Sequence, residues 1–296
     1  MKIGFIGLGI MGHPMFLNIA RKHDDEVFCT DISTESALKI AEEAQALGAK
    51  ASAVPGNLEL AEKADVIISM VPRSEDSLAV YREILPALGP GKICIDMSTI
   101  DPEVSVEIAG FVRETGAEYA DAPVVKSQAA AVAGKLGIYV GSTPELFEQI
   151  RPILSYMGET ILHLGENGRG LVMKICHNAL VSQIQNGVNE TSELARRNGI
   201  DARTYVRAIA AGGGQNAYLD NHVEMLAENE FPAAFTIQNA AKDVHICLDL
   251  AARTGLLMPG EENAVKVFDK AMEMGFAKED WAATVKAYRE LAEEGL

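Results

Sequence analysis

Short apolar runs alternate with amphipathic stretches in the first half of the chain. The apolar runs that predict strands are Ile3–Ile6, Glu26–Cys29, Val66–Met70, Lys92–Ile95 and Gly137–Val140. Most are apolar at nearly every position, which is typical of strands buried on both faces of a parallel sheet. The stretches with apolar residues at helical spacing are His13–Arg21, Thr34–Leu47, Ser77–Leu85 and Pro102–Arg113. This alternation predicts βα units around a doubly wound, mostly parallel sheet.

The strand pattern ends near residue 164, and apolar residues then recur with a helical period. The helices predicted there are Gly170–Arg197, Ala202–Ala210, Phe235–Thr254, Glu261–Met274 and Trp281–Glu290. Glycines mark the junction, and no Ser- or Pro-rich linker separates the two halves. We therefore predict an α/β domain at residues 1–164, followed by an all-α domain at residues 165–296.

Composition and charge restrict the partners of the chain. With 296 residues, 48% of them hydrophobic and 23% charged, the sequence has a globular composition. Its formal net charge of −16 repels polyanions, so we expect neither nucleic acid nor an anionic membrane as a partner. An anionic substrate therefore needs a local group of Lys or Arg side chains.

The cysteines and the apolar runs indicate a reducing, aqueous compartment. The four cysteines are far apart in the sequence and form no C-x-x-C pair, which favours reduced, buried thiols over disulfides or metal ligands. The runs Asp65–Val71 and Leu136–Val140 are too short to cross a bilayer, and no leader precedes Met1–Gly7. We expect a cytoplasmic protein.

A glycine-rich segment lies between the first predicted strand and the first predicted helix. Its residues are Gly7, Leu8, Gly9, Ile10, Met11 and Gly12, which match the G-x-G-x-x-G pattern. In a βα turn, such glycines permit a tight turn, close approach of the backbone to a pyrophosphate, and close packing of the helix on the strand. The helix N-terminus adds N–H donors for the phosphates. The segment predicts a dinucleotide site, and the alternative is an ordinary tight turn.

Asp31 ends the second predicted strand, nineteen residues after Gly12. An acidic side chain at this place hydrogen-bonds the adenosine ribose hydroxyls and repels a ribose phosphate. No basic residue occurs between Cys29 and Leu38 to bind such a phosphate, so the sequence favours NAD over NADP. The alternative is that Asp31 caps the next helix.

Several segments together resemble the β-hydroxyacid dehydrogenase family, which includes 3-hydroxyisobutyrate dehydrogenase and tartronate semialdehyde reductase. The segments, in family order, are residues 4–12 (GFIGLGIMG), 96–99 (DMST), 121–124 (DAPV), 170–174 (GLVMK) with Asn178, and 242–243 (KD). The resemblance implies an NAD-binding Rossmann domain, a helical substrate and dimerisation domain, an active site in the cleft between them, and homodimers or homotetramers.

The resemblance also implies the catalytic residues. In this family, the lysine that matches Lys174 gives a proton to the carbonyl oxygen or takes one from the hydroxyl, and the asparagine that matches Asn178 helps to hold lysine and substrate. Helical spacing independently puts both side chains on one face. A solvent-exposed lysine is the alternative for Lys174, but its mostly apolar neighbours argue against it. Helical geometry turns His177 about 100° away from Asn178.

Other cofactor contacts follow from position and resemblance. Val71, Pro72, Arg73 and Thr99 follow predicted strands and lie at the carboxyl edge, where doubly wound sheets bind ligands. The resemblance places Lys242 near the nicotinamide and gives Asp243 an orienting role. An exposed Lys242–Asp243 ion pair is the alternative.

The substrate loop departs from the family pattern D-A-P-V-S-G-G. Val125 replaces the serine, and Lys126 and Ser127 replace the two glycines. Valine donates no hydrogen bond, whereas a lysine supplies positive charge for a carboxylate or a sulfonate. Sulfolactaldehyde reductases, a branch of the family, also have a cationic and hydroxylated loop here, though with other residues. The alternative is that Lys126 points to solvent.

The sequence therefore predicts an NAD-dependent oxidoreductase for a small anionic hydroxy acid or its semialdehyde. Candidate substrates are 3-hydroxyisobutyrate, tartronate semialdehyde and sulfolactaldehyde. A non-catalytic NAD-binding interaction protein and an imine reductase are the alternatives, and the presence of both Lys174 and Asn178 argues against each of them.

Overall fold

The computed structural model describes the backbone of residues 1–294 and the side chains of residues 1–290. The chain forms two compact units, residues 1–174 and residues 175–296, which divide within one long helix, α8 (Arg169–Arg197). The predicted domain boundary at 164/165 falls one residue before the end of the last strand, β9, and ten residues before the division between the units. The first turn of α8 belongs to the first unit. Residues 295 and 296 of the predicted second domain lie outside the described residues.

The first unit contains a nine-stranded sheet with the strand order β3-β2-β1-β4-β5-β6-β8-β7, in which β9 also pairs with β8. The strands are β1 (Ile3–Ile6), β2 (Val27–Thr30), β3 (Ala51–Ala53), β4 (Val66–Ser69), β5 (Ile93–Asp96), β6 (Glu118–Asp121), β7 (Val124–Val125), β8 (Leu136–Gly141) and β9 (Gly158–Gly165). Only the β6–β8 and β7–β8 pairs are antiparallel. The predicted mostly parallel sheet is confirmed.

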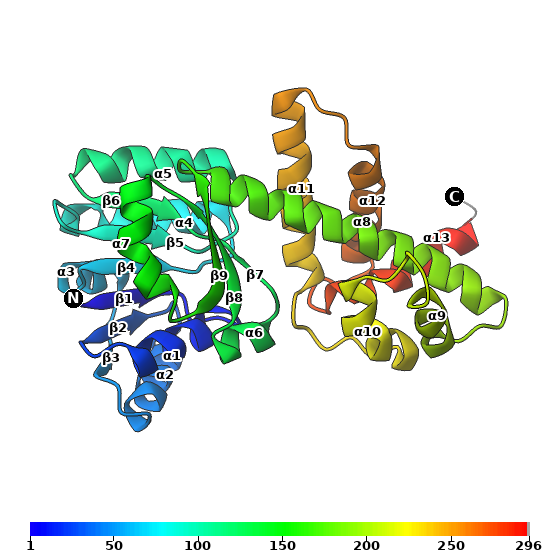
Figure 1. Cartoon of the computed structure of the whole chain (residues 1–296), viewed down its shortest axis with the longest axis horizontal. Coiled ribbons are helices and arrows are strands. Elements are labelled where there is room, and N and C mark those ends of the chain that lie inside the picture. The colour runs from blue at the N-terminus through cyan, green and yellow to red at the C-terminus, as the bar shows by residue number, and fades with distance from the viewer. Residues whose placement is uncertain (295–296) are drawn as a thin grey trace. The chain divides into compact units, whose positions relative to one another are not determined.

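Helices cover both faces of this sheet (Figure 1). They are α1 (Gly12–Lys22), α2 (Thr34–Ala46), α3 (Asn57–Lys63), α4 (Ser74–Ile84), the 3₁₀ turn η1 (Leu85–Ala87), α5 (Pro102–Glu114), α6 (Gln128–Ala133) and α7 (Pro144–Leu154). Consecutive strand residues enter opposite cores. Phe5 packs in the core that includes α1, α2 and α7, whereas Ile6 packs in the core that includes α3, α4 and α5. This alternation explains why the strands β1, β2, β4 and β5 are apolar at nearly every position.

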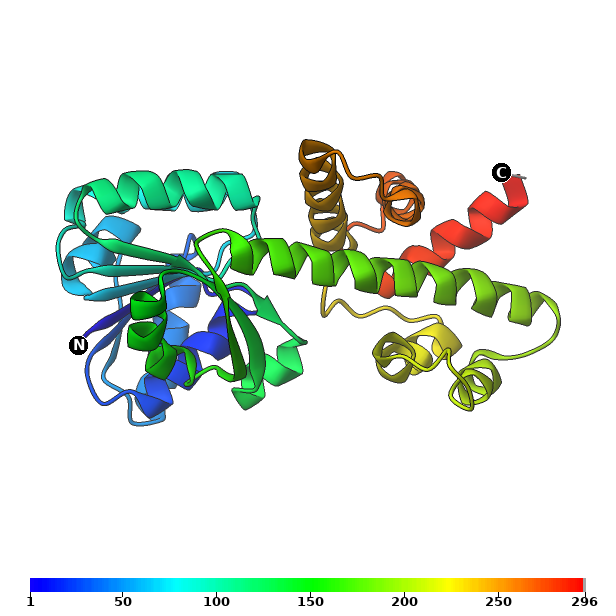
Figure 2. The same cartoon turned by 45° about the horizontal axis from the view of Figure 1, so that its top comes forward.

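Among its described residues the second unit contains helices joined by loops and turns, and no strand, as Figure 2 shows. After α8 come α9 (Ala202–Ile209), α10 (Ala217–Glu228), α11 (Ile237–Thr254), α12 (Pro259–Glu273), the 3₁₀ turn η2 (Trp281–Ala283) and α13 (Thr284–Glu294). A separate core forms here around Leu219, Ile237 and Phe268. The prediction of an all-α second half is confirmed, with α10 as a helix that the sequence analysis missed.

The structure bears on two features that the sequence analysis used to infer the compartment, the cysteines and the apolar segments. All four cysteines are free thiols, but only three are buried, since Cys176 on α8 is exposed. The expectation of buried thiols is therefore wrong for Cys176, because its position on α8 faces outward. Among the residues that the structure describes, each helix is too short or too polar to cross a membrane.

Candidate active site

The glycine-rich loop has the geometry that each glycine was predicted to provide. Gly7 has a φ of +93°, and a Cβ there would lie 2.3 Å from the carbonyl oxygen of Met70. A Cβ on Gly12 would lie 1.9 Å from the carbonyl oxygen of Gly7, so α1 packs directly on the turn. At Gly9 a Cβ would meet no atom within 4 Å. This loop therefore leaves open space at Gly9, where a pyrophosphate would approach the backbone.

Asp31 bonds to the loop and does not cap α2. Its carboxylate accepts the backbone N–H of Leu8 at 2.7 Å and that of Ser33 at 2.9 Å. The N-cap of α2 is Ser33, whose hydroxyl accepts the N–H of Ser36. Asp31 thus holds the end of β2 against the glycine loop, where a ribose would lie. A carboxylate oxygen accepts more than one hydrogen bond, so these contacts leave capacity for ribose hydroxyls.

A buried polar network supports the carboxyl ends of β4 and β5. The Ser98 hydroxyl accepts the N–H of Val71 at 2.9 Å, and Asp96 accepts both the Ser98 N–H and the Ser69 hydroxyl at 3.0 Å. Burial raises the pKa of Asp96. The network fixes the edge from which Val71, Pro72 and Thr99 continue.

Arg73 lies on this edge as the N-cap of α4. Its guanidinium makes two bonds of 2.9 Å to the carboxylate of Asp76, and its side chain is 64% exposed. The backbone of Arg73 is therefore at the predicted place, while its charge is directed to a neighbouring acid.

The loop of Val125, Lys126 and Ser127 has a lysine where the family pattern has a glycine, and this lysine adopts a backbone conformation typical of glycine. Lys126 has a φ of +82°, a left-handed conformation that glycine adopts without cost. Its ammonium lies 2.6 Å from Glu159 Oε1 and 2.9 Å from the carbonyl oxygen of Lys135. Val125 is buried in β7, and the exposed Ser127 is the N-cap of α6. Lys126 is thus ion-paired, which neither the substrate interpretation nor the solvent alternative anticipated.

Lys174 and Asn178 lie one turn apart on α8. Lys174 is half-buried and is the last residue of the first unit, whereas Asn178 belongs to the second. The Asn178 amide donates to Asp243 Oδ2 at 2.6 Å, and the imidazole Nδ1 of His177 lies 3.2 Å from Asn178 Oδ1. The expectation that His177 turns away from Asn178 is therefore wrong, because the two adjacent side chains bend toward each other.

Asp243 on α11 connects Asn178 with Lys242. Its carboxylate is buried, and Lys242 Nζ lies 2.9 Å from its Oδ1, in the geometry of an ion pair rather than of an aligned hydrogen bond. The Lys242 side chain is 22% exposed. The alternative of an exposed ion pair does not apply, since the shared carboxylate is buried.

The predicted residues divide between the two units. The first unit holds the glycine loop, Asp31, the β4–β5 edge, the substrate loop and Lys174. The second unit holds Asn178 and Lys242. Gly212, Gly213 and Gly214 lie in the turn between α9 and α10.

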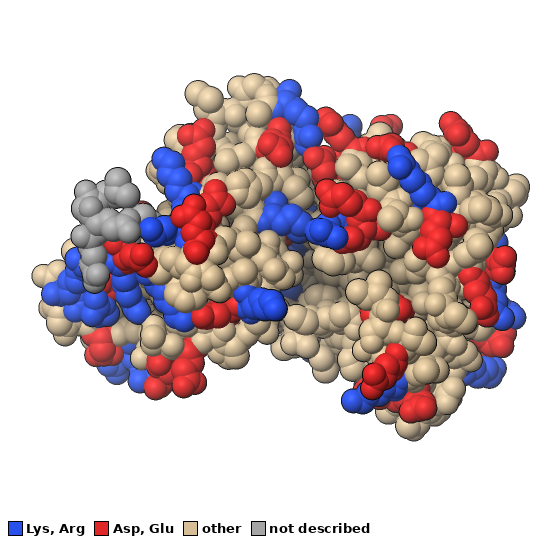
Figure 3. Space-filling model, turned by 180° about the vertical axis from the view of Figure 1, so that it is seen from behind, with Lys and Arg blue, Asp and Glu red and all other residues tan. Residues whose placement is uncertain are grey.

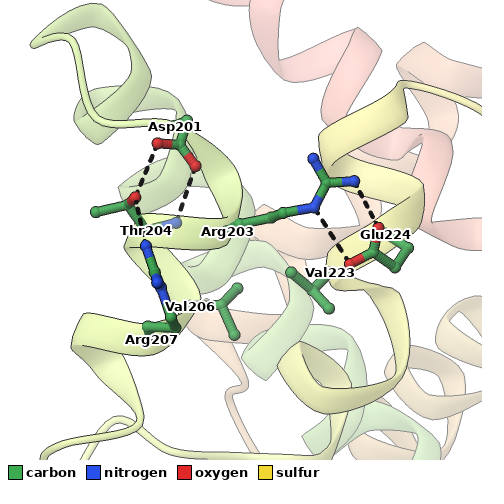
Figure 4. A pocket seen from close by; sticks show the side chains of 7 residues that line it. All are labelled: Asp201, Arg203, Thr204, Val206, Arg207, Val223 and Glu224. Atoms are coloured by element: carbon green, nitrogen blue, oxygen red, sulfur yellow. Dashed lines mark hydrogen bonds and ion pairs between the residues drawn. The ribbon is translucent and has the colours of Figure 1, made fainter.

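A cavity of about 460 Å³ in the second unit involves none of the predicted site residues. Residues of α9 and α10 line it together with Asp201, and Figure 4 shows Arg203 crossing to Glu224, 2.6 Å away. Basic side chains lie beside acidic ones on the face shown in Figure 3 as well. Glu193 on α8 contacts three arginines, and the hydrogen bond from Arg196 lowers the pKa of Glu193 to about 2. The charged side chains around this cavity and around Glu193 are therefore accounted for by ion pairs with one another.

Known proteins are similar to both units. Residues 2–165 match the NAD-binding domain of 6-phosphogluconate dehydrogenase, and residues 168–288 match the NAD-binding domain of NADP-dependent 3-hydroxyisobutyrate dehydrogenase. The chain is 31% identical to 2-hydroxy-3-oxopropionate reductase of Escherichia coli strain K12, over 100% of both chains. It is also 31% identical to the NAD-dependent L-serine dehydrogenase of Pseudomonas aeruginosa, over 97% of each.

A solved structure of 3-hydroxyisobutyrate dehydrogenase from Mycobacterium tuberculosis with L-serine has the same fold. The TM-score is 0.84 at 28% identity, over 97% of this chain and 99% of that one. The glycine loop has the geometry of a dinucleotide-binding turn, and the chain is similar over its full length to hydroxyacid dehydrogenases. Both observations point to the same family. The chain belongs to the β-hydroxyacid dehydrogenase family of NAD-binding oxidoreductases.

Proposed function

We propose that this protein transfers hydride between NAD(H) and a small anionic β-hydroxy acid or its semialdehyde, with Lys174 as the general acid and base. The observation that carries the proposal is the side-chain arrangement on α8. Lys174 precedes by one turn an asparagine whose amide is fixed by the buried carboxylate of Asp243. A fixed amide one helical turn from a lysine is suited to hold a substrate oxygen while a proton is transferred.

The residues have separate roles in this mechanism. Bound NADH supplies the hydride for reduction of the carbonyl carbon. The open backbone at Gly9 and the N-terminus of α1 would hold its pyrophosphate, and Asp31 would accept hydrogen bonds from its ribose hydroxyls. Lys174 stabilises the negative charge that develops on the substrate oxygen and delivers the proton, while Asn178 orients both groups. In the oxidative direction Lys174 takes the hydroxyl proton.

Asp31 is expected to determine the preference for NAD. Asp31→Ser removes the negative charge that repels a ribose phosphate, and it also removes the carboxylate acceptor for the ribose hydroxyls. The ratio of kcat/KM for NADH to that for NADPH should fall by roughly tenfold or more, as one lost charged hydrogen bond implies. Steady-state kinetics with both cofactors measures it. Wild-type protein that already prefers NADPH would contradict the assignment.

We further propose that the loop of Val125, Lys126 and Ser127 binds the acidic group of the substrate. A non-glycine residue at a φ of +82° is strained by about 1 kcal/mol, so lysine at this place is costly for the backbone. The ammonium is held by Glu159 and the Lys135 carbonyl, at a loop that continues from the strand β7. A positive charge held in this loop suits a carboxylate or a sulfonate.

Variants of Lys126 test this role on a panel of small carboxylate and sulfonate aldehydes and hydroxy acids. Lys126→Met and Lys126→Gly should both raise KM for the best substrate by roughly tenfold or more, as expected for loss of a charge-assisted hydrogen bond. Only the glycine variant also relieves the backbone, so its melting temperature should not fall.

Glu159→Gln is the matched control because it releases the Lys126 ammonium without removing it. Its KM should stay equal or decrease. The double variant Val125→Ser with Lys126→Gly restores the family loop and should favour simple carboxylates such as 3-hydroxyisobutyrate. An unchanged ranking of substrates in all these variants would show that Lys126 serves only Glu159.

Assembly and compartment complete the proposal. Leu180 and Leu194 on α8 are 60% and 63% exposed, and large apolar side chains on a long helix support its burial against another copy in a homodimer or homotetramer. The free thiols support a reducing compartment such as the cytoplasm.

A further inference from the structure

The carboxylate of Asp121, at the end of β6, lies at the N-terminus of α8. Its Oδ1 accepts the side-chain N–H of Asn167 at 2.7 Å and the backbone N–H of Gly168 at 2.6 Å. Its Oδ2 accepts the backbone N–H of Leu171 at 2.9 Å. These donors belong to the turn that starts α8, where N–H groups lack partners within the helix. Asp121 is therefore attached to the first turn of this helix.

Two glycines lie directly against the Asp121 carboxylate. Asp121 is fully buried, and a Cβ on Gly141 would lie 2.3 Å from its Oδ1. A Cβ on Gly170 would lie 2.7 Å from its Oδ2 and 2.5 Å from the carbonyl oxygen of Tyr139. Glycine at both positions lets the helix start approach β6 and β8 closely. A displacement of either carboxylate oxygen would therefore shift the helix start.

The three donors to Asp121 are neutral N–H groups. Burial raises the pKa of Asp121 to about 6, and the hydrogen bonds from Gly168, Leu171 and Asn167 oppose this shift. The positive end of the helix dipole adds to their stabilisation of the charge. A buried charge held by neutral donors is costly, but its two oxygens accept three N–H groups at once, which a single Ser or Thr hydroxyl does not.

Asp121 connects two parts of the proposed site. Residues 124–125, four positions or fewer after it, form the strand that leads into the substrate loop. Leu171, which it holds, precedes Lys174 by three residues on the same helix. We propose that Asp121 is a positioning residue that sets the place of the Lys174 ammonium relative to the substrate loop. This inference rests on the proposed function, in which Lys174 transfers the proton.

Asp121→Asn tests this role with little change of volume. The amide retains one acceptor oxygen, but its NH₂ group now faces an N–H donor, so the first turn of α8 must move. We expect kcat to fall by roughly tenfold or more, because small misplacements of a catalytic group cost that much. KM for NADH should stay within about twofold, since the glycine loop is unaffected.

Asp280→Asn is the matched control. Asp280 is also buried and also accepts three N–H groups, from Ala234, Phe235 and Ala282, each at 3.1 Å. Both variants should lower the melting temperature, but only Asp121→Asn should lower kcat. In the double variant with Lys174→Ala, Asp121→Asn should reduce the residual rate no further, because it acts through Lys174. A full additional loss, or an equal loss of kcat in Asp280→Asn, overturns the proposal.

Hydrogen exchange of the peptide over residues 166–173 distinguishes this inference from the proposed function. Faster exchange there in Asp121→Asn than in wild type shows that the helix start is released. Release with normal kcat overturns the positioning role, and unchanged exchange overturns the attachment itself. A wild-type protein that turns over no substrate of the panel, or a Lys174→Ala variant with normal turnover, instead refutes the proposed function, and the inference falls with it.

Discussion

Replacing Lys174 with alanine is expected to lower kcat for the best substrate by at least ~100-fold, the usual contribution of a positioned general acid. The dissociation constant of NADH should change by less than about twofold, because the glycine loop and Asp31 are separate from this side chain in the sequence and bind each other. The variant should also fold normally, since Lys174 is only half-buried. Steady-state reduction of the best substrate measures kcat, and fluorescence titration measures the dissociation constant of NADH.

Lys174→Arg separates charge from proton transfer. Arginine keeps the positive charge and a comparable length, but it does not release its proton near neutral pH. If Lys174 acts as general acid and base, this variant should be nearly as slow as Lys174→Ala, although its KM for an anionic substrate stays close to that of wild type. Turnover close to that of wild type in either variant would refute the mechanism.

The fold was predictable where the pattern of the sequence is long and uniform. The strands β1, β4 and β5 are buried on both faces, so each produces a continuous apolar run that the sequence displays. The missed strands lack this signal. β9 has only one buried residue, Gly158, β3 and β7 have three and two residues, and β6 begins with the exposed Glu118. Pairing in the sheet, rather than local pattern, makes these segments strands.

The site was predictable only in its local parts. The glycine loop and the spacing of Lys174 and Asn178 are properties of one βα turn and one helix, which sequence alone describes. The contacts that hold these residues connect distant positions. Asn178 and Asp243 are 65 residues apart, and Asp121 and Leu171 are 50 apart. Only the folded topology brings such pairs together, so no periodicity or motif spacing predicts which carboxylate serves which donor.

The ion-pair partner of Lys126 was also not predictable from the sequence. The sequence indicated a cation in place of a glycine, but the partner Glu159 lies 33 residues later on a strand that was not predicted. Without that strand, substrate and solvent were the only partners to consider. The left-handed backbone at Lys126 was likewise invisible to pattern, although the family's glycine at this position is consistent with it.

The second large effect is expected at Gly9. A Cβ at this position meets no protein atom within 4 Å, and its φ lies outside the left-handed region, so a side chain is compatible with the fold. The open space is where we place the pyrophosphate. At Gly12, by contrast, a Cβ would lie 1.9 Å from the carbonyl oxygen of Gly7 and would displace α1 from the turn. A side chain at Gly9 should therefore affect cofactor binding, whereas a side chain at Gly12 should affect folding.

Gly9→Val should raise the dissociation constant of NADH by roughly 100-fold, because filling a close-fitting contact costs up to about 3 kcal/mol. Its melting temperature without cofactor should stay within about 2 °C of wild type, whereas Gly12→Val should lower the melting temperature strongly or prevent folding. Calorimetric titration and thermal unfolding of the two variants measure both effects. Unchanged NADH binding by a folded Gly9→Val protein would show that the pyrophosphate does not lie against this backbone, and the loop would then be an ordinary tight turn.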